Sequence, residues 1–200
     1  GSPANLAVYL ALLPLGGKIM GMSLDHGGHL THGHKVSATG KFWTAVHYGV
    51  DRTTEQLDYD EIKKIAMRER PNIIVAGYTA YPRIVDWQKF REIADTCNAL
   101  FMVDMSHVAG LVAGGVYPSP FPYADIVTTT THKTLRGPRS ALIFSKIDDR
   151  ELGRKIDKAI FPGLQGGPHL NQIAAVAVAL AEAGQPAFKK YAKQIIKNTK

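Results

Sequence analysis

The chain contains 200 residues, with 24 Lys and Arg against 17 Asp and Glu and a formal net charge of +7. This length can bury a substantial core, and a single cysteine, Cys97, excludes an internal disulfide framework and a four-thiolate zinc site. The longest apolar run, 173–181, is far shorter than the ~20 residues of a membrane helix, and no basic-then-apolar leader opens the chain. We therefore expect a cytoplasmic protein without a membrane partner.

Short apolar runs alternate with amphipathic segments along the chain. In chain order these patterns predict a helix at 4–13, strands at 18–22 and 43–50, a helix at 58–70, a strand at 73–76, a helix from Asp86, its N-cap, to Cys97, strands at 100–104, 125–130 and 140–145, and helices at 150–160, 170–183 and 187–197. The run at 73–76 is apolar throughout, which is typical of strands buried on both faces. Strand, helix and strand over 73–104 form a βαβ unit, so we expect an α/β fold with a mostly parallel central sheet and helices on both faces.

Polar residues follow several of the predicted strands. Asp104 ends the strand at 100–104, His107 lies three residues further on, Thr79 follows the strand at 73–76, and the segment 128–133 (TTTTHK) follows another. Ligands of parallel α/β sheets bind beyond the carboxyl ends of the strands. We therefore expect these side chains to form a site, in which a buried Asp104 needs a cationic partner such as a protonated cofactor nitrogen or a metal ion.

Lys133 is the candidate nucleophile of this site. It lies between a run of threonines and a segment that contains Arg136 and Arg139, and no amphipathic helix holds it at a surface. Neighbouring positive charge and removal from water lower the pKa of a lysine and make it competent for Schiff-base chemistry. We expect Arg136 and Arg139 to supply that charge.

The segment 26–34 (HGGHLTHGH) holds four histidines in nine residues. Such a cluster is compatible with a metal site completed by Asp104 and His107. No two of these histidines have the helical i, i+4 spacing that fixes a ligand pair, and the glycines suit a backbone that passes close to a flat ligand. We therefore favour one imidazole stacked on a ligand ring and expect no metal ion.

Two further segments are candidates for binding phosphate. Residues 1–5 open a helix, where free backbone N–H groups and the positive end of the helix dipole attract an anion. Residues 161–168 (FPGLQGGP) form a glycine turn of the kind that makes an anion nest, although an ordinary loop has the same composition.

Four motifs, in this order and spacing, resemble the serine hydroxymethyltransferase family: HGGHL (26–30), DMSHVAGL (104–111), TTTTHKTLRGPR (128–139) and FPGLQGGP (161–168). The resemblance extends over the whole chain. It implies a pyridoxal-phosphate enzyme with the aspartate-aminotransferase-like fold, which interconverts serine plus tetrahydrofolate with glycine plus 5,10-methylenetetrahydrofolate. It also implies that residues 1–200 are the central part of the large cofactor-binding domain, without an N-terminal segment and a C-terminal small domain, and we expect little or no turnover from this piece alone.

The resemblance assigns a role to each matching residue. Lys133 is expected to form the Schiff base with pyridoxal phosphate, Asp104 to pair with the pyridinium nitrogen, His29 to stack on the ring, and His107 to lie near the phenolic oxygen. The phosphate is expected to contact Ser2, Gly1 and His132, and also Gly166 and Gly167 from a neighbouring subunit, which implies a homodimer or homotetramer with shared active sites. Thr79 replaces a common serine at a cofactor-binding position, and Thr130 and Arg139 are expected to support the site or the substrate.

Other functions remain open at this level. The same cofactor could serve an aldolase acting on β-hydroxy amino acids such as threonine, or an aminotransferase. A histidine-rich metal hydrolase would use His26, His29, His32 and Asp104. The positive charge is also compatible with a nucleic-acid-binding module, but the basic residues are dispersed over amphipathic segments without aromatic interleaving, so we expect no nucleic-acid partner.

Overall fold

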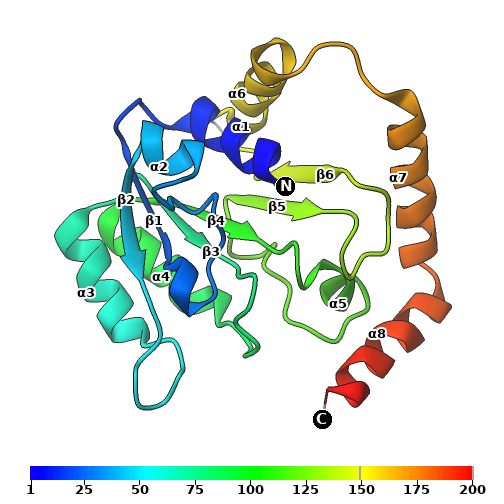
Figure 1. Ribbon diagram of the computed structural model, residues 1–200, viewed down its shortest axis with the longest axis horizontal. Helices are drawn as coiled ribbons and strands as arrows, with labels where there is room; N and C mark the ends of the chain where they lie inside the picture. Colours follow the sequence, from blue (N-terminus) through cyan, green and yellow to red (C-terminus); the bar gives the residue numbers. More distant parts are fainter. Residues whose placement is uncertain (149, 200) are drawn as a thin grey trace.

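The computed structural model describes residues 1–148 and 150–199. Its centre is a sheet in the order β2-β1-β3-β4-β5-β6 (Figure 1). The strands are β1 (Lys18–Met22), β2 (Thr44–Tyr48), β3 (Ile73–Ala76), β4 (Leu100–Asp104), β5 (Ile126–Thr130) and β6 (Ala141–Ser145). All neighbours pair in parallel except β5 and β6, which are antiparallel. The prediction of a mostly parallel α/β sheet is confirmed.

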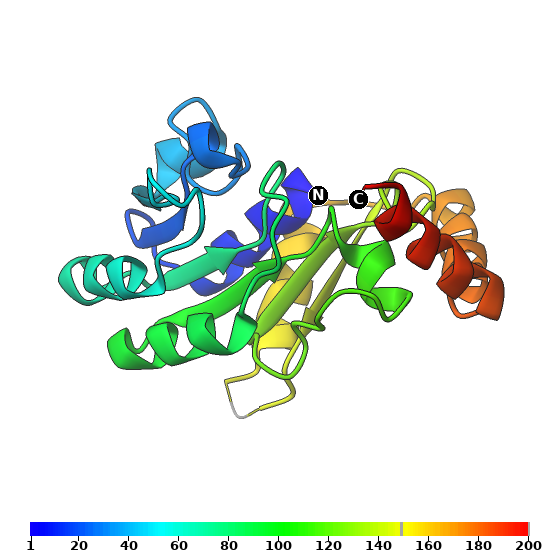
Figure 2. The ribbon, with the colours of Figure 1, turned by 90° about the horizontal axis from the view of Figure 1, so that it is seen from below.

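Helices cover both faces of this sheet (Figure 2). One face packs against α3 (Tyr59–Glu69), α4 (Trp87–Cys97), α5 (Ala109–Ala113) and α8 (Pro186–Asn198), and the other against α1 (Ser2–Leu12) and α6 (Leu152–Lys158). The side chains of strand β3 are buried on both faces of the sheet. Ile74 and Ala76 belong to the core under α3 and α4, whereas Ile73 and Val75 belong to the core under α1 and α6. Successive side chains point to opposite faces of a strand, so an apolar run is buried on both sides.

Local capping explains where the helices begin and end. The Asp58 side chain accepts hydrogen bonds from the backbone N–H groups of Asp60 and Glu61, and Asp86 accepts one from that of Lys89. These contacts satisfy backbone donors in the first helical turn, and the predicted N-cap at Asp86 is confirmed. The same two helices end where Arg70 and Asn98 adopt left-handed backbone conformations.

Several predicted boundaries differ from the structure. The strand predicted at 43–50 is shorter, because Trp43 ends a short helix, α2 (Ala38–Phe42), that was not predicted. The helix predicted at 150–160 ends at Lys158 and continues as the irregular segment η2 (Ala159–Leu164), in which Phe161 has non-helical angles before Pro162. The short η1 (Leu24–His26) and α5 were not predicted either. Strand β6 reverses direction because only ten residues join it to β5, too few for a parallel crossover.

The chain leaves the compact body after η2. Segment η2 packs against α1 and α6, and residues 165–169, called the arch below, lead across to α7 (Leu170–Ala183), after which α8 packs against α5 (Figure 1). Large apolar side chains are exposed on η2 and α7: Phe161, Leu164, Leu170, Ile173, Val178 and Leu180. No helix in the described part of the chain has the length and apolar character required to cross a lipid bilayer.

Candidate functional site

Asp104 occupies the centre of the candidate site, at the carboxyl end of β4. Its Oδ1 accepts hydrogen bonds from the Ser106 backbone N–H (3.1 Å) and the Ser106 hydroxyl (2.5 Å). Its Oδ2 lies 2.8 Å from Asn5 Nδ2 and 3.3 Å from His32 Nε2. Burial by itself raises the pKa of this carboxyl, but the hydrogen bonds from His32, Ser106 and Asn5 outweigh it and hold the pKa well below its usual range. Asp104 is therefore a buried, charged carboxylate.

Gly77 allows the end of β3 to approach this carboxylate. The residue has φ +108°, and a Cβ atom placed on it would lie 1.9 Å from the backbone oxygen of Asp104. An L side chain would clash there and is also disfavoured at this φ angle. Glycine is thus required for the packing of β3 against the residue on which the site is built.

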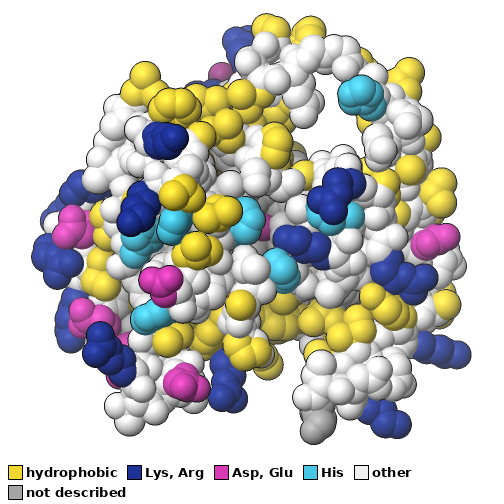
Figure 3. Space-filling model, in the orientation of Figure 1, with side chains coloured by type: hydrophobic (Ala, Val, Ile, Leu, Met, Phe, Trp, Pro, Cys, Tyr) yellow, Lys and Arg dark blue, Asp and Glu magenta, His cyan; other side chains and the backbone are white. Residues whose placement is uncertain are grey.

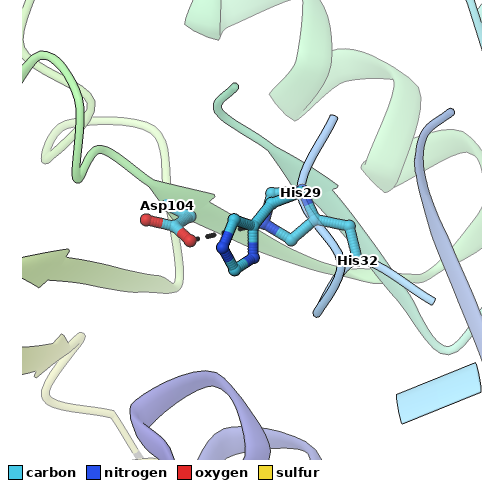
Figure 4. A group of neighbouring side chains, drawn as sticks. All are labelled: His29, His32 and Asp104. Atoms are coloured by element: carbon cyan, nitrogen blue, oxygen red, sulfur yellow. Dashed lines mark hydrogen bonds and ion pairs between the residues drawn. The ribbon is translucent and has the colours of Figure 1, made fainter. Parts of the chain in front are cut away.

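His29 and His32 approach Asp104 from the loop that follows β1 (Figure 4). His32 is buried and lies against Asp104, whereas His29 is partly exposed and contacts Thr31, whose hydroxyl oxygen is 2.7 Å from His29 Nδ1. Burial, followed by the nearby His32, lowers the pKa of His29 to about 4, although the negative charge of Asp104 opposes this. His29 therefore presents a neutral imidazole at neutral pH.

Lys133 and His107 complete the ionisable groups of the site. Burial lowers the pKa of Lys133, and the charge of Asp104 opposes that shift. Burial and then the positive charge of Lys133 lower the pKa of His107. The expectation that Arg136 and Arg139 depress the pKa of Lys133 is wrong. The Arg136 guanidinium stacks 4.6 Å from the ring centre of Tyr191, and neither arginine contributes to the shift of Lys133, for which burial is the cause.

The N-terminus of α1 borders a cleft of about 930 Å³, which is also lined by residues of β6, α6 and the arch. Gly1, Ser2, His132 and Arg139 are among its lining residues. Histidine, lysine and arginine side chains gather near the middle of the face shown in Figure 3. Burial, and next the nearby charge of Arg139, lower the pKa of His132. The helix terminus and the positive charge of Arg139 together make this part of the cleft suitable for an anion.

Two buried polar atoms close to the helix terminus have no hydrogen-bond partner within residues 1–148 and 150–199. These are the Thr130 hydroxyl and Nδ1 of His132. Thr130 is next to the first residue of the chain, since a Cβ atom on Gly1 would lie 2.8 Å from Thr130 Cγ2. Buried polar atoms are normally paired, so a polar ligand at this position would satisfy them.

The remaining predicted cofactor-binding residues, Thr79, Gly166 and Gly167, are exposed. Thr79 is exposed, and its backbone N–H donates to the Gly27 carbonyl over 2.8 Å. Gly166 and Gly167 lie on the arch and are exposed, and a Cβ atom placed on either would have no neighbour within 4 Å in the described part of the chain. The need for glycine at these two positions is therefore not explained by contacts within this chain.

The metal-site alternative finds partial geometric support. His29, His32 and Asp104 each offer a ligand atom, and these atoms lie within 4.8 Å of one another. His26 does not join them, because its Nδ1 accepts a hydrogen bond from the Val50 backbone N–H over 2.9 Å. Protein donors already occupy both oxygens of Asp104. The cluster is thus explained as a hydrogen-bond network.

Three residues of the site were not predicted to contact Asp104 or His29: Asn5, Thr31 and Ser106. Ser106 could have been found, since a hydroxyl two residues after an aspartate commonly folds back onto its carboxylate. Asn5 could not, because 99 positions separate it from Asp104 and only the placement of α1 brings the two together.

The fold and the site define a parallel α/β protein with a carboxylate, an imidazole and a lysine at the carboxyl edge of its sheet. The chain belongs to the serine hydroxymethyltransferase family, whose model matches residues 1–200.

Similar proteins carry the same family name. The chain is 56% identical over its full length to serine hydroxymethyltransferase of Nostoc sp. (strain PCC 7120), and 61% identical over 198 residues to that of Desulfotalea psychrophila. It is 60% identical over 198 residues to serine hydroxymethyltransferase 2 of Salmonella typhi. These alignments cover 99–100% of the chain but only 46–47% of the relatives, so the chain spans about half the length of the curated relatives it matches.

Proposed function

We propose that the complete protein containing this chain is a pyridoxal-phosphate-dependent serine hydroxymethyltransferase. It would interconvert L-serine and tetrahydrofolate with glycine and 5,10-methylenetetrahydrofolate. The observation that carries this proposal is the charged, buried Asp104 beside a neutral His29 and a lysine, Lys133, whose pKa is lowered by burial. The family and the names of the relatives support the same reaction.

The residues present fit pyridoxal phosphate. Asp104 remains ionised because donors surround it, so it can pair with a protonated pyridine nitrogen. His29 offers the flat face of a neutral ring. The α1 terminus, with the unpartnered Thr130 hydroxyl and His132 Nδ1, provides donors that a phosphate can use. When bound, pyridoxal phosphate withdraws electrons from the bonds at the Cα of an amino acid.

Four side chains of this chain would have separate roles in the reaction. Lys133 supplies the attacking amine, and burial increases the fraction of that amine that is unprotonated. Asp104 would favour a protonated ring nitrogen by offering it a fixed negative charge, and His29 would lie against the ring of the bound cofactor. His107, held neutral by burial and by Lys133, can accept a hydrogen bond or donate one without adding charge.

The oligomeric state belongs to the same proposal. The exposed apolar side chains on η2 and on α7, and the exposed Gly166 and Gly167, suit a surface that is covered in a homodimer or homotetramer with shared sites. Residues 1–200 would then be the central part of the large domain and would show little turnover alone. A cytoplasmic location and the absence of a nucleic-acid partner stay predictions.

The test uses the complete protein with serine and tetrahydrofolate, and measures glycine formation together with the visible absorption of the lysine-bound cofactor. We expect Lys133→Ala to lose that absorption and to reduce turnover by several orders of magnitude, as the removal of a covalent catalyst does. Lys189→Ala, on the exposed face of α8, is the matched control and should behave as wild type. Unchanged absorption in Lys133→Ala, or serine cleavage that does not respond to tetrahydrofolate, would contradict the proposal.

A further inference from the structure

A continuous chain of hydrogen bonds links the candidate cofactor carboxylate to His29 through α1. Asn5 Nδ2 lies 2.8 Å from Asp104 Oδ2 and 2.9 Å from Thr31 Oγ1. The Thr128 hydroxyl lies 2.7 Å from Asn5 Oδ1, and Thr31 Oγ1 lies 2.7 Å from His29 Nδ1. Asn5, Thr31, Asp104 and Thr128 are all buried, so each of these polar atoms depends on its partner in the chain.

The direction of each hydrogen bond follows from the chemistry of its ends. An ionised carboxylate only accepts, so Asn5 must turn its NH₂ group toward Asp104, which leaves its carbonyl oxygen to accept from Thr128. The second N–H of the same NH₂ group donates to the Thr31 oxygen. That oxygen is then an acceptor for Asn5, and its own proton is available for His29.

His29 Nδ1 therefore faces two donors. The Thr31 hydroxyl lies 2.7 Å from this nitrogen, and the Thr31 backbone N–H donates to it over 3.2 Å. A proton on Nδ1 would displace the Thr31 backbone N–H and would force the Thr31 hydroxyl to accept instead of donate, so the ring carries its proton on Nε2. An imidazolium would face the same two donors and is disfavoured for the same reason.

We propose that Asn5 and Thr31 are positioning residues that hold His29 as the neutral tautomer protonated on Nε2, and so present an uncharged ring to the face of the cofactor. The last clause rests on the proposed function, whereas the tautomer follows from the hydrogen bonds alone. An uncharged ring suits this place, because an imidazolium would repel a protonated pyridine ring. Neither residue contacts the reacting atoms in this assignment; both act through His29 and Asp104.

The other titratable groups that face His29 are His32 from the same loop, Asp104 from β4, His107 from the segment after β4, and Lys133 from the segment after β5. Three of them disfavour an imidazolium and Asp104 favours it. These groups stay in place when Thr31 is changed, so a change in His29 can be attributed to the lost hydroxyl.

The experiment records the ¹⁵N chemical shifts of the histidine ring nitrogens in the cofactor-free complete protein labelled with ¹⁵N-histidine. The resonances of His29 are identified by their loss in His29→Gln. In the wild type we expect an unprotonated Nδ1 and a protonated Nε2. In Thr31→Val, which keeps the shape and the backbone N–H but removes the hydroxyl, we expect the pKa of His29 to rise by roughly 1, the equivalent of one lost hydrogen bond. Asn5→Leu should act in the same direction.

Thr31→Ser restores a hydroxyl and should restore the wild-type spectrum, whereas Thr44→Val, exposed on β2, is the control for an unrelated threonine. A wild-type proton on Nδ1 would overturn the proposal. So would a Thr31→Val protein that keeps both the tautomer and the pKa of the wild type, or a Thr31→Ser protein that resembles Thr31→Val. Because the spectra are recorded without cofactor, substrate or turnover, their outcome is independent of whether the proposed reaction is correct. If a variant does not fold, the wild-type spectrum still decides which nitrogen carries the proton.

Discussion

Acid should destabilise this protein in part through His29, and the size of the effect can be worked out from the structure. The pKa of His29 is lowered from 6.5 to about 4, mainly by burial. Unfolding returns the ring to water, so between pH 6.5 and 4 the unfolded state binds a proton that the folded state does not. The lowered pKa of His29 therefore costs no folding stability above pH 6.5. Below that value the free energy of unfolding decreases as the pH falls toward 4.

The full difference in pKa corresponds to roughly 3 kcal/mol at 1.36 kcal/mol per pH unit. Because the ring is only partly buried, solvent screens the effect, and we expect about 1.5 kcal/mol. The assay is urea unfolding of the cofactor-free complete protein at pH 7.5 and pH 4.5. Between these pH values, His29→Gln should lose about 1.5 kcal/mol less stability than the wild type.

The informative quantity is the difference between His29→Gln and the wild type in the stability that each loses from pH 7.5 to pH 4.5. The pKa values of His107 and His132 are also lowered, so both proteins lose stability in acid. His47→Gln, which removes an exposed histidine from β2, should keep the wild-type response because that side chain is solvated in both states. Equal losses in the wild type and in His29→Gln would refute the reasoning.

Two structural predictions can be checked by the same unfolding assay. Gly77→Val should destabilise the protein by about 3 kcal/mol or more, since its Cβ would lie 1.9 Å from the Asp104 backbone oxygen at a φ angle that L residues avoid. A variant with wild-type stability would show instead that β3 can shift to make room for the side chain. Asp125→Ala should cost about 3 kcal/mol, because it leaves the largely buried Arg91, now 2.7 Å from Asp125, without that partner. Asp125→Ala should leave the KM for serine unchanged, as the carboxylate lies at the opposite end of β5 from the site; a raised KM would contradict that placement.

Much of the site is predictable because parallel strands end at one edge of a sheet. Asp104, Thr130 and Lys133 are found simply by reading the residues that follow apolar runs, and β4 and β5 place Asp104 opposite Thr128 in register. Burial of β3 on both faces is also predictable, because its residues are apolar throughout and successive side chains point to opposite faces. The pKa of Lys133 illustrates the limit: the direction is predictable, but the neighbouring arginines were the wrong cause, because sequence proximity does not show where a guanidinium points.

By itself, the sequence determines the fold class, most helix and strand positions, the family motifs and the residue types at the strand ends, since these depend on local periodicity and spacing. The tertiary structure alone decides the strand order, the reversal of β6 and the network through Asn5 and Thr31. Asn5 meets Asp104 only because α1 packs across the sheet with its N-terminus at the carboxyl edge. Such contacts depend on how buried faces pack together, and no local pattern in the chain specifies which distant residues will share a hydrogen bond.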